Sequence, residues 1–278
     1  MAKIPRLMPQ NPRLFRAEVV RTERVSPSMQ RVTVTGADLG EFPWLGYDHW
    51  FRLFMQLPHQ SVLRLPEFTG DRWWHAYLAI PEDERPHYSN YTVAGHRPEA
   101  AEMDIDFVVH RGPTGELEGR AAIWACAARP GDGLAVLDQG VMFDPPQDAS
   151  EVIVVADESG LPAVTGILRS LPRDTVGRLI QEVPTEADRR DLDAPAAMTV
   201  TWVVRDGRED REDSAAVPGD AALEELRRHS AVDTHAYAFV VGESGLTTKG
   251  RRHLHRAGLP KDRIMFSGFW KHEARRPA

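Results

Sequence analysis

The chain has little cysteine and no long apolar run. Its single cysteine, Cys126, excludes an intramolecular disulfide and a cysteine-based zinc site, so we expect a reducing, cytoplasmic location. No run reaches the roughly 18 apolar residues that a membrane helix needs. No apolar segment of the signal-peptide type follows the N-terminal residues. We therefore expect a protein that is neither secreted nor bound to a membrane.

Positive charge is also scarce. The 278 residues include 34 lysines and arginines against 41 aspartates and glutamates, a net charge of −7 at pH 7. This balance offers no broad cationic surface for phosphates, so we expect no nucleic-acid partner. The contents of 42% hydrophobic and 27% charged residues are typical of a globular protein, and the length predicts two domains at about 150 residues each.

Several catalytic and metal-binding patterns are absent. The sequence has no Gly-x-Ser-x-Gly elbow, no P-loop and no kinase signature. His253 and His255 lie two positions apart on a predicted helix and therefore point in different directions, and the other histidines are scattered. We expect no metal site, and the residues alone identify no catalytic side chain.

The first half of the chain has the pattern of β-strands. Apolar and β-branched residues alternate with polar ones and are interrupted by Gly, Pro and Asp, as in an antiparallel barrel or sandwich. The strands are expected over Phe15–Val25, Met29–Thr35, Asp48–Gln56, Met103–His110 and Leu134–Leu137. A short helix is expected between Gly119 and Ala128, ending at Pro130-Gly131.

The second half has a βα pattern. Continuous apolar runs alternate with helical stretches, which predicts a small doubly wound parallel sheet. Strands are expected over Val152–Ala156, Arg178–Val183, Met198–Val204 and Tyr237–Val241, with a helix over Leu161–Leu171 and an exposed loop over Arg205–Asp220. The Pro-rich segment Asp144–Ser150 is the predicted linker. We therefore expect a barrel domain at 1–146 and an α/β domain at 147–278.

Local patterns compatible with cofactor binding also have ordinary structural interpretations. The turn at 156–162 holds one glycine where the dinucleotide fingerprint has three, so a plain strand-to-helix turn with Pro162 near its start is at least as good an interpretation. Tyr91 beside Thr92 could flank a flat heterocycle or form part of a barrel wall. His110, at a predicted strand end, could contact a ligand or lie at the surface.

Seven short motifs occur in a fixed order along the chain. They are Arg85-Pro86 with Tyr91-Thr92-Val93, Asp106–His110, Gly119–Ala125, Pro130–Asp132, Ala156–Ala163, Val241–Ser244 and Ser267–Lys271. Their order and spacing, from roughly residue 15 to residue 271, resemble those of the siderophore-interacting proteins, which are flavin-dependent ferric-siderophore reductases. The resemblance implies a ferredoxin-reductase-like plan, with a six-stranded antiparallel barrel for FAD and a C-terminal domain for NAD(P)H.

The resemblance also implies an activity and residue roles. Hydride from NAD(P)H would reduce the flavin, and electrons would then pass singly to Fe(III) in a ferric siderophore or related ferric chelate. Arg52 and Lys271 match basic positions that would attract this anionic substrate. We expect a monomer. The implied cofactor-binding residues are Tyr91, Thr92, Val93, His110, Gly119, Ala121, Ala122 and Trp124 for the flavin, and Asp157, Glu158, Ser159, Gly242, Glu243 and Ser244 for the nicotinamide side.

The chain departs from the family pattern where FAD phosphates would bind. Ser89 and Ala94 stand where the family has arginine, and residues 119–122 read Gly-Arg-Ala-Ala in place of Gly-Pro-Ala-Ser. The candidates for a replacement cation are Arg97, Arg111 and Arg120. The departures leave three alternatives open, namely weak FAD binding, FMN or a deazaflavin in its place, or a siderophore-binding or iron-handling protein without turnover. A flavin reductase with another electron acceptor is the alternative among enzymes.

Overall fold

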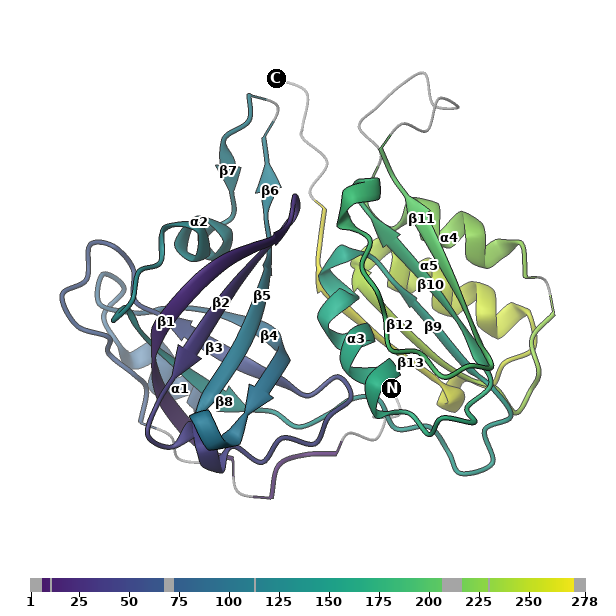
Figure 1. The fold of residues 1–278 in the computed structure, drawn as a ribbon, viewed down its shortest axis with the longest axis horizontal. Coiled ribbons are helices and arrows are strands. Elements are labelled where there is room, and N and C mark those ends of the chain that lie inside the picture. The colour runs from purple at the N-terminus through teal and green to yellow at the C-terminus, as the bar shows by residue number, and fades with distance from the viewer. Residues whose placement is uncertain are drawn as a thin grey trace. The chain divides into compact units, whose positions relative to one another are not determined.

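The computed structural model describes residues 7–10, 12–67, 73–112, 114–206, 217–229 and 231–272. The chain forms two compact units, one of residues Leu7–Val141 and a second that includes residues 142–272 (Figure 1). Within the described residues, no helix is both long and apolar enough to cross a bilayer. Most of the loop predicted over Arg205–Asp220 lies outside the described residues.

The first unit is built on a closed barrel of six antiparallel strands, which confirms the predicted fold class. Its strand order is β1-β2-β5-β4-β3-β8. Period-two patterning produces this arrangement because alternate residues of each strand point into the barrel. The strands are β1 Leu14–Ser26, β2 Met29–Thr35, β3 Trp50–Met55, β4 His87–Arg97, β5 Glu102–Val108 and β8 Gly133–Asp138.

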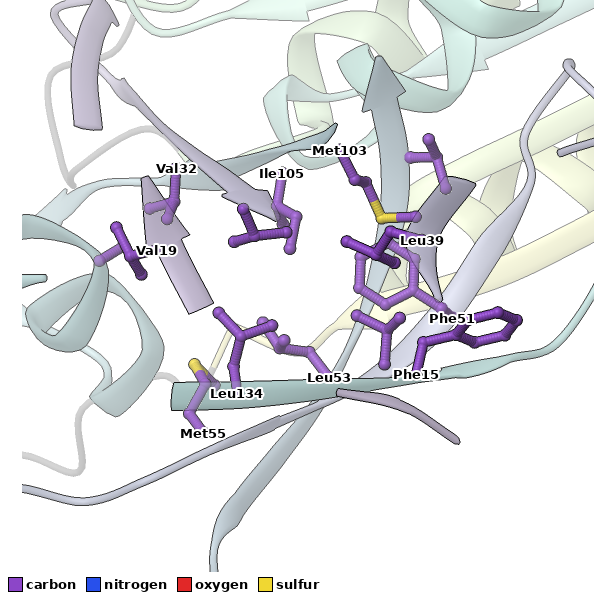
Figure 2. Packing of buried hydrophobic residues seen from close by; sticks show 14 of the residues in the cluster. Phe15, Val19, Val32, Leu39, Phe51, Leu53, Met55, Met103, Ile105 and Leu134 are labelled. Atoms are coloured by element: carbon purple, nitrogen blue, oxygen red, sulfur yellow. The ribbon is translucent and has the colours of Figure 1, made fainter. Parts of the chain in front are cut away.

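Apolar side chains fill the barrel. Figure 2 shows these side chains gathered from several strands, with Phe51, Leu53 and Met55 all contributed by β3. The predicted strand 103–110 is divided in the structure. Strand β5 ends at Val108, which pairs with Met29, the first residue of β2, so the ladder between these two strands ends there. His110 belongs instead to a separate short strand.

Smaller elements surround the barrel. Helix α1 (Trp73–Ala79) lies in the connection between β3 and β4, where the sequence predicted no helix. Helix α2 (Arg120–Ala127) forms within the predicted range and packs against β2, β4 and β5. A hairpin of β6 (His110–Arg111) and β7 (Leu117–Glu118) precedes it. The short 3-10 helices are η1 Leu39–Glu41 and η3 Pro98–Ala100.

The second unit is a five-stranded parallel sheet with the order β11-β10-β9-β12-β13, which confirms the predicted doubly wound α/β class. Helix α3 covers one face, and α4 and α5 cover the other (Figure 1). The strands are β9 Val152–Ala156, β10 Gly177–Val183, β11 Met198–Val204, β12 Tyr237–Glu243 and β13 Ile264–Trp270; the helices are α3 Leu161–Ser170, α4 Asp220–Arg227 and α5 Ser244–Arg256, with 3-10 helices η4 Glu158–Gly160, η5 Glu186–Asp188 and η6 Lys261–Arg263.

Candidate functional site

A row of aromatic rings joins β4 to α2 in the first unit. The ring of Tyr91 lies 4.4 Å from that of Phe107, and Phe107 lies 5.8 Å from Trp124 (centroid distances). Trp124 and Phe107 belong to the barrel core, and Tyr91 packs against that core. The row therefore fixes α2 against the strand that carries the Tyr-Thr-Val motif. Trp124 contributes to this region by packing in the barrel core.

The three motif residues on β4 do not share one face. Tyr91 and Val93 pack against or within the barrel core, whereas Thr92 points to the other side of the strand and is buried opposite Trp50. The phenol of Tyr91 has no hydrogen-bond partner among the described residues, and burial raises its pKa above the ordinary value. Tyr91 thus presents a neutral hydroxyl that is available to a ligand.

His110 and the start of α2 lie close together because the β6–β7 hairpin joins them. His110 pairs with Glu118, the residue immediately before Gly119. Gly119 has a φ of +86°, and a Cβ at this position would meet no atom within 4 Å. The structure therefore brings together His110 and the predicted helix-opening residues, with open space above the glycine.

The first turn of α2 has hydrogen-bond donors that no described side chain caps. Among the described residues, the first N–H that bonds a carbonyl in this turn is that of Ile123, which donates to Gly119. The N–H groups of Arg120, Ala121 and Ala122 precede it and point out of the helix end, where the helix dipole favours an anion. Together with the Tyr91 hydroxyl, this donor set fits a flavin that carries phosphate.

Of the three candidate replacement cations, Arg97 is already committed elsewhere. Its guanidinium bonds the Asp104 carboxylate at 2.7 and 2.8 Å and Glu102 at 3.0 Å. The hydrogen bond to Asp104 raises the pKa of Arg97 further above its ordinary value. Moving this side chain to a ligand would leave the buried Asp104 with one fewer partner, which is costly.

Arg111 and Arg120 differ in their surroundings. Arg111 donates to the carbonyl of Gly115 at 2.7 Å within its own hairpin. Arg120 is exposed at the first position of α2 and forms no ion pair with the described residues. Burial lowers the pKa of His87, at the start of β4, and the charge of Arg120 lowers it further. Of the three candidates, Arg120 is therefore the exposed cation whose charge acts near the start of β4.

In the second unit, the two predicted nicotinamide-side segments meet at one edge of the sheet. Asp157–Ser159 follow β9, and Gly242–Ser244 end β12 and begin α5. Strands β9 and β12 are neighbours, and the strand order reverses direction between them. The carboxyl edge at such a reversal is where open α/β sheets bind nucleotides.

Asp157 is buried and holds this edge together. Its carboxylate accepts from Ser159 N–H and Oγ at 2.9 and 2.5 Å, from Glu243 N–H at 2.6 Å and from Trp270 Nε1 at 3.1 Å. Burial and the neighbouring Glu158 raise the pKa of Asp157 to about 7, and the hydrogen bonds act in the opposite direction. Gly242 has no Cβ because one would lie 2.5 Å from this carboxylate.

Glu158 also points into the protein. Its carboxylate pairs with the Arg205 guanidinium at 2.8 and 2.9 Å, and Arg205 also pairs with Glu182 at 2.7 Å. Both glutamates are buried. Asp157 and Glu158 are expected from the family resemblance to face the nicotinamide. In the structure both carboxylates are buried and bonded within the protein, whereas Ser159 is partly exposed.

Glu243 and Ser244 tie the C-terminal residues to the same edge. The Glu243 carboxylate accepts from the N–H groups of Gly245 and Leu246 at the start of α5, and from His272 N–H at 3.2 Å. Ser244 Oγ donates to the Trp270 carbonyl at 2.7 Å. No local pattern in the sequence predicts the contacts of Arg205 with Glu158 or of Trp270 with Asp157, because they join residues far apart in the chain.

The two predicted substrate-binding cations lie in different units. Arg52 is on the outer face of β3, where its guanidinium lies 4.5 Å from the Trp73 ring centroid and donates to Asn90 Oδ1 at 3.2 Å. Lys271 is exposed just after β13. Among the described residues, no group of three His, Cys, Asp or Glu side chains is arranged to hold a metal ion.

Comparisons with known proteins cover nearly the whole chain. A family model described as a siderophore-interacting FAD-binding domain matches residues 18–142, and one described as siderophore-interacting protein matches residues 149–273. The chain is 30% identical over 262 residues to a ferric vibriobactin reductase of Vibrio cholerae, covering 94% of this chain and 89% of that protein.

Two further similarities extend this comparison. An NADPH-dependent ferric-chelate reductase of Escherichia coli is 29% identical over 191 residues, covering 68% of this chain and 70% of that protein. Among solved structures, a siderophore utilization protein from T. fusca aligns with a TM-score of 0.79 and 27% identity, over 99% of both chains. The resemblance identified from the sequence motifs is thereby confirmed.

Proposed function

The chain belongs to the siderophore-interacting protein family, and we propose that it is a flavoprotein that reduces ferric siderophores or related ferric chelates with NADH or NADPH. The observation that carries the proposal is the uncapped start of α2, which lies beside the open side of Gly119 in the barrel that matches the FAD-binding family model. Two relatives are named as ferric reductases, which supports the same reaction.

The barrel residues would hold the cofactor. When bound, FAD would supply two kinds of chemistry, namely hydride transfer from a reduced nicotinamide and one-electron transfer to Fe(III). We propose that the phosphates accept hydrogen bonds from Arg120, Ala121 and Ala122 N–H, with the Arg120 guanidinium providing the charged contact. Tyr91, Thr92 and Val93 would border the flavin ring, and His110 would contact the ribityl or phosphate part.

The carboxyl edge of the second sheet would bind the pyridine nucleotide. In this proposal Asp157 and Glu243 act as positioning residues, because each holds backbone N–H groups of the turns at this edge. Ser159, Gly242 and Ser244 would line the nucleotide. Glu158 is paired with Arg205, so its charge does not disfavour a 2′-phosphate. Residues 1–146 and 147–278 are the proposed flavin and nucleotide domains.

The ferric substrate would be attracted by positive charge. Arg52 and Lys271 are each a proposed substrate-binding residue, since a surface cation raises the encounter rate of an anionic chelate. The partial exposure of Arg52 and the exposure of Lys271 suit this role. The protein would need no metal of its own, because the iron is the substrate.

Reversing the charge at Arg120 should weaken flavin binding. A charged hydrogen bond contributes about 1.5–3 kcal/mol, so Arg120→Glu should raise the Kd for FAD by about 10- to 100-fold. Titration by flavin-fluorescence quenching measures this. Arg111→Glu is the matched control, because Arg111 is bonded within its own hairpin and should leave the Kd within about twofold. Equal effects of both variants, or none, would contradict the assignment of Arg120.

A further inference from the structure

A cluster of aromatic side chains on the outside of the barrel has no role in the proposed function so far. Helix α1 contributes Trp73, Trp74 and Tyr77, and β4 contributes Tyr88; we call these four residues the aromatic platform. Trp74 is stacked on Tyr77 with centroids 5.5 Å apart and planes 19° apart. Tyr88 lies 5.6 Å from Trp74 and 5.7 Å from Trp73, edge to face.

The platform packs against the barrel on one side and is open to solvent at Trp74. Phe54, fully buried on β3, contacts Trp73, Tyr77 and Tyr88 from beneath. Tyr77 is 7% exposed, and its hydroxyl donates to the Pro86 carbonyl at 2.9 Å. Trp74, by contrast, is 38% exposed. An indole held in place by its neighbours yet open to solvent loses little side-chain entropy when a flat ring stacks on it.

The platform adjoins the phosphate-binding end of the proposed FAD site. Tyr88 is the residue before Ser89 and lies three residues before Tyr91, a separation of about 10 Å along the strand. Helix α2 packs against this strand. Burial raises the pKa of the Tyr77 phenol, and the nearby charges of Arg85 and Arg120 act in the opposite direction. The first residue of α2 therefore lies within electrostatic reach of the platform.

We propose that the aromatic platform binds the adenine ring of FAD, with the exposed indole of Trp74 as the stacking surface. The inference rests on the proposed function, because it takes the start of α2 as the diphosphate site. Tyr91 and Tyr88 lie on β4, against which α2 packs, so Tyr91, α2 and the platform would contact the flavin ring, the diphosphate and the adenine of FAD, respectively. FMN lacks the adenylate half, so the platform would select FAD over FMN.

Replacing Trp74 separates this inference from the function itself. Stacking of a base on an aromatic side chain contributes to binding affinity. We therefore expect Trp74→Ala to raise the Kd for FAD by about 5- to 100-fold. The Kd for FMN should stay within about twofold, since FMN has no group to stack there. Trp74→Phe, which keeps a ring, should recover most of the FAD affinity. Val62→Ala is the control, as another exposed apolar side chain, and should change neither Kd.

Fluorescence-quenching titrations of the full chain with FAD and FMN measure the wild-type protein and the three variants, and ADP competition gives a second reading. ADP should displace FAD from the wild-type protein. The Trp74→Ala substitution should weaken the binding of ADP at least as much as the binding of FAD. Equal weakening of FAD and FMN would overturn the inference, because the platform would then only support the fold. So would an unchanged Kd for FAD combined with a raised KM for an aromatic ferric chelate. Failure of the wild-type protein to bind either flavin would instead reject the proposed function itself.

Discussion

Replacing Arg205 by alanine is expected to lower the free energy of unfolding of the second unit by about 3–5 kcal/mol. The side chain of Arg205 is 10% exposed, and it is the charged partner of both Glu158 and Glu182, which are 2% and 0% exposed. Glu182 also accepts from the N–H groups of Gly219 and Ala222 at the start of α4. Without the guanidinium, two buried carboxylates lose the cation with which both pair in the described part of the chain.

Chemical denaturation of Arg205→Ala and the wild-type protein measures this loss. The control is Arg228→Ala, which removes an ion pair with Glu225 in which the arginine side chain is 69% exposed. Such a surface pair is worth about 0–1 kcal/mol. A loss at Arg205 no larger than that at Arg228 would show that the buried pairs do not stabilise this unit.

Replacing Asp157 by asparagine should change how stability depends on pH. The pKa of Asp157 in the folded protein is about 7, raised by burial and by Glu158, whereas an aspartate in an unfolded chain has a pKa of about 3.9. The folded state therefore keeps a proton that the unfolded state releases. The stability that this proton provides is complete below about pH 4 and is lost as the pH rises through about 7.

Between about pH 5 and about pH 8, the free energy of unfolding of the wild-type protein should fall by about 2.5 kcal/mol relative to that of Asp157→Asn. Denaturation curves at several pH values measure the difference. Asp148→Asn is the control, because the hydrogen bond from Arg263 lowers the pKa of this exposed carboxyl and its contribution changes only below this range. If the difference in free energy of unfolding between the wild-type protein and Asp157→Asn does not vary with pH, the pKa of Asp157 is not raised.

Most strands could be predicted because burial leaves a pattern in the sequence, although no range was predicted for β4 or β13. Predicted strands at 29–35, 152–156 and 198–204 correspond to β2, β9 and β11 with the same bounds. Helix α1 was not predicted, since it has only seven residues and three of them are Trp or Tyr, which are typical of strands. The aromatic platform, which depends on α1, was invisible for the same reason.

The ordered motifs identified the family, but they did not show which way side chains point. Asp157 and Glu158 looked like two carboxylates at a ligand, yet both are turned inward. Their partners Trp270 and Arg205 lie 113 and 47 positions away in the chain. Only the folded sheet brings such residues together, and no local pattern reports it. The same holds for Arg97, whose pairing with Asp104 removes it from the candidate cations.

The central claim is that this chain uses a flavin to carry electrons from a pyridine nucleotide to ferric iron. The most direct measurement is anaerobic stopped-flow absorbance of the FAD-loaded protein. NADH or NADPH should bleach the visible flavin band, and a ferric siderophore should restore it. A ferrous-specific chelator should then trap two Fe(II) for each nicotinamide oxidised, because one hydride carries two electrons. A protein that retains no flavin, or a reduced flavin that ferric chelates do not reoxidise, would contradict the account.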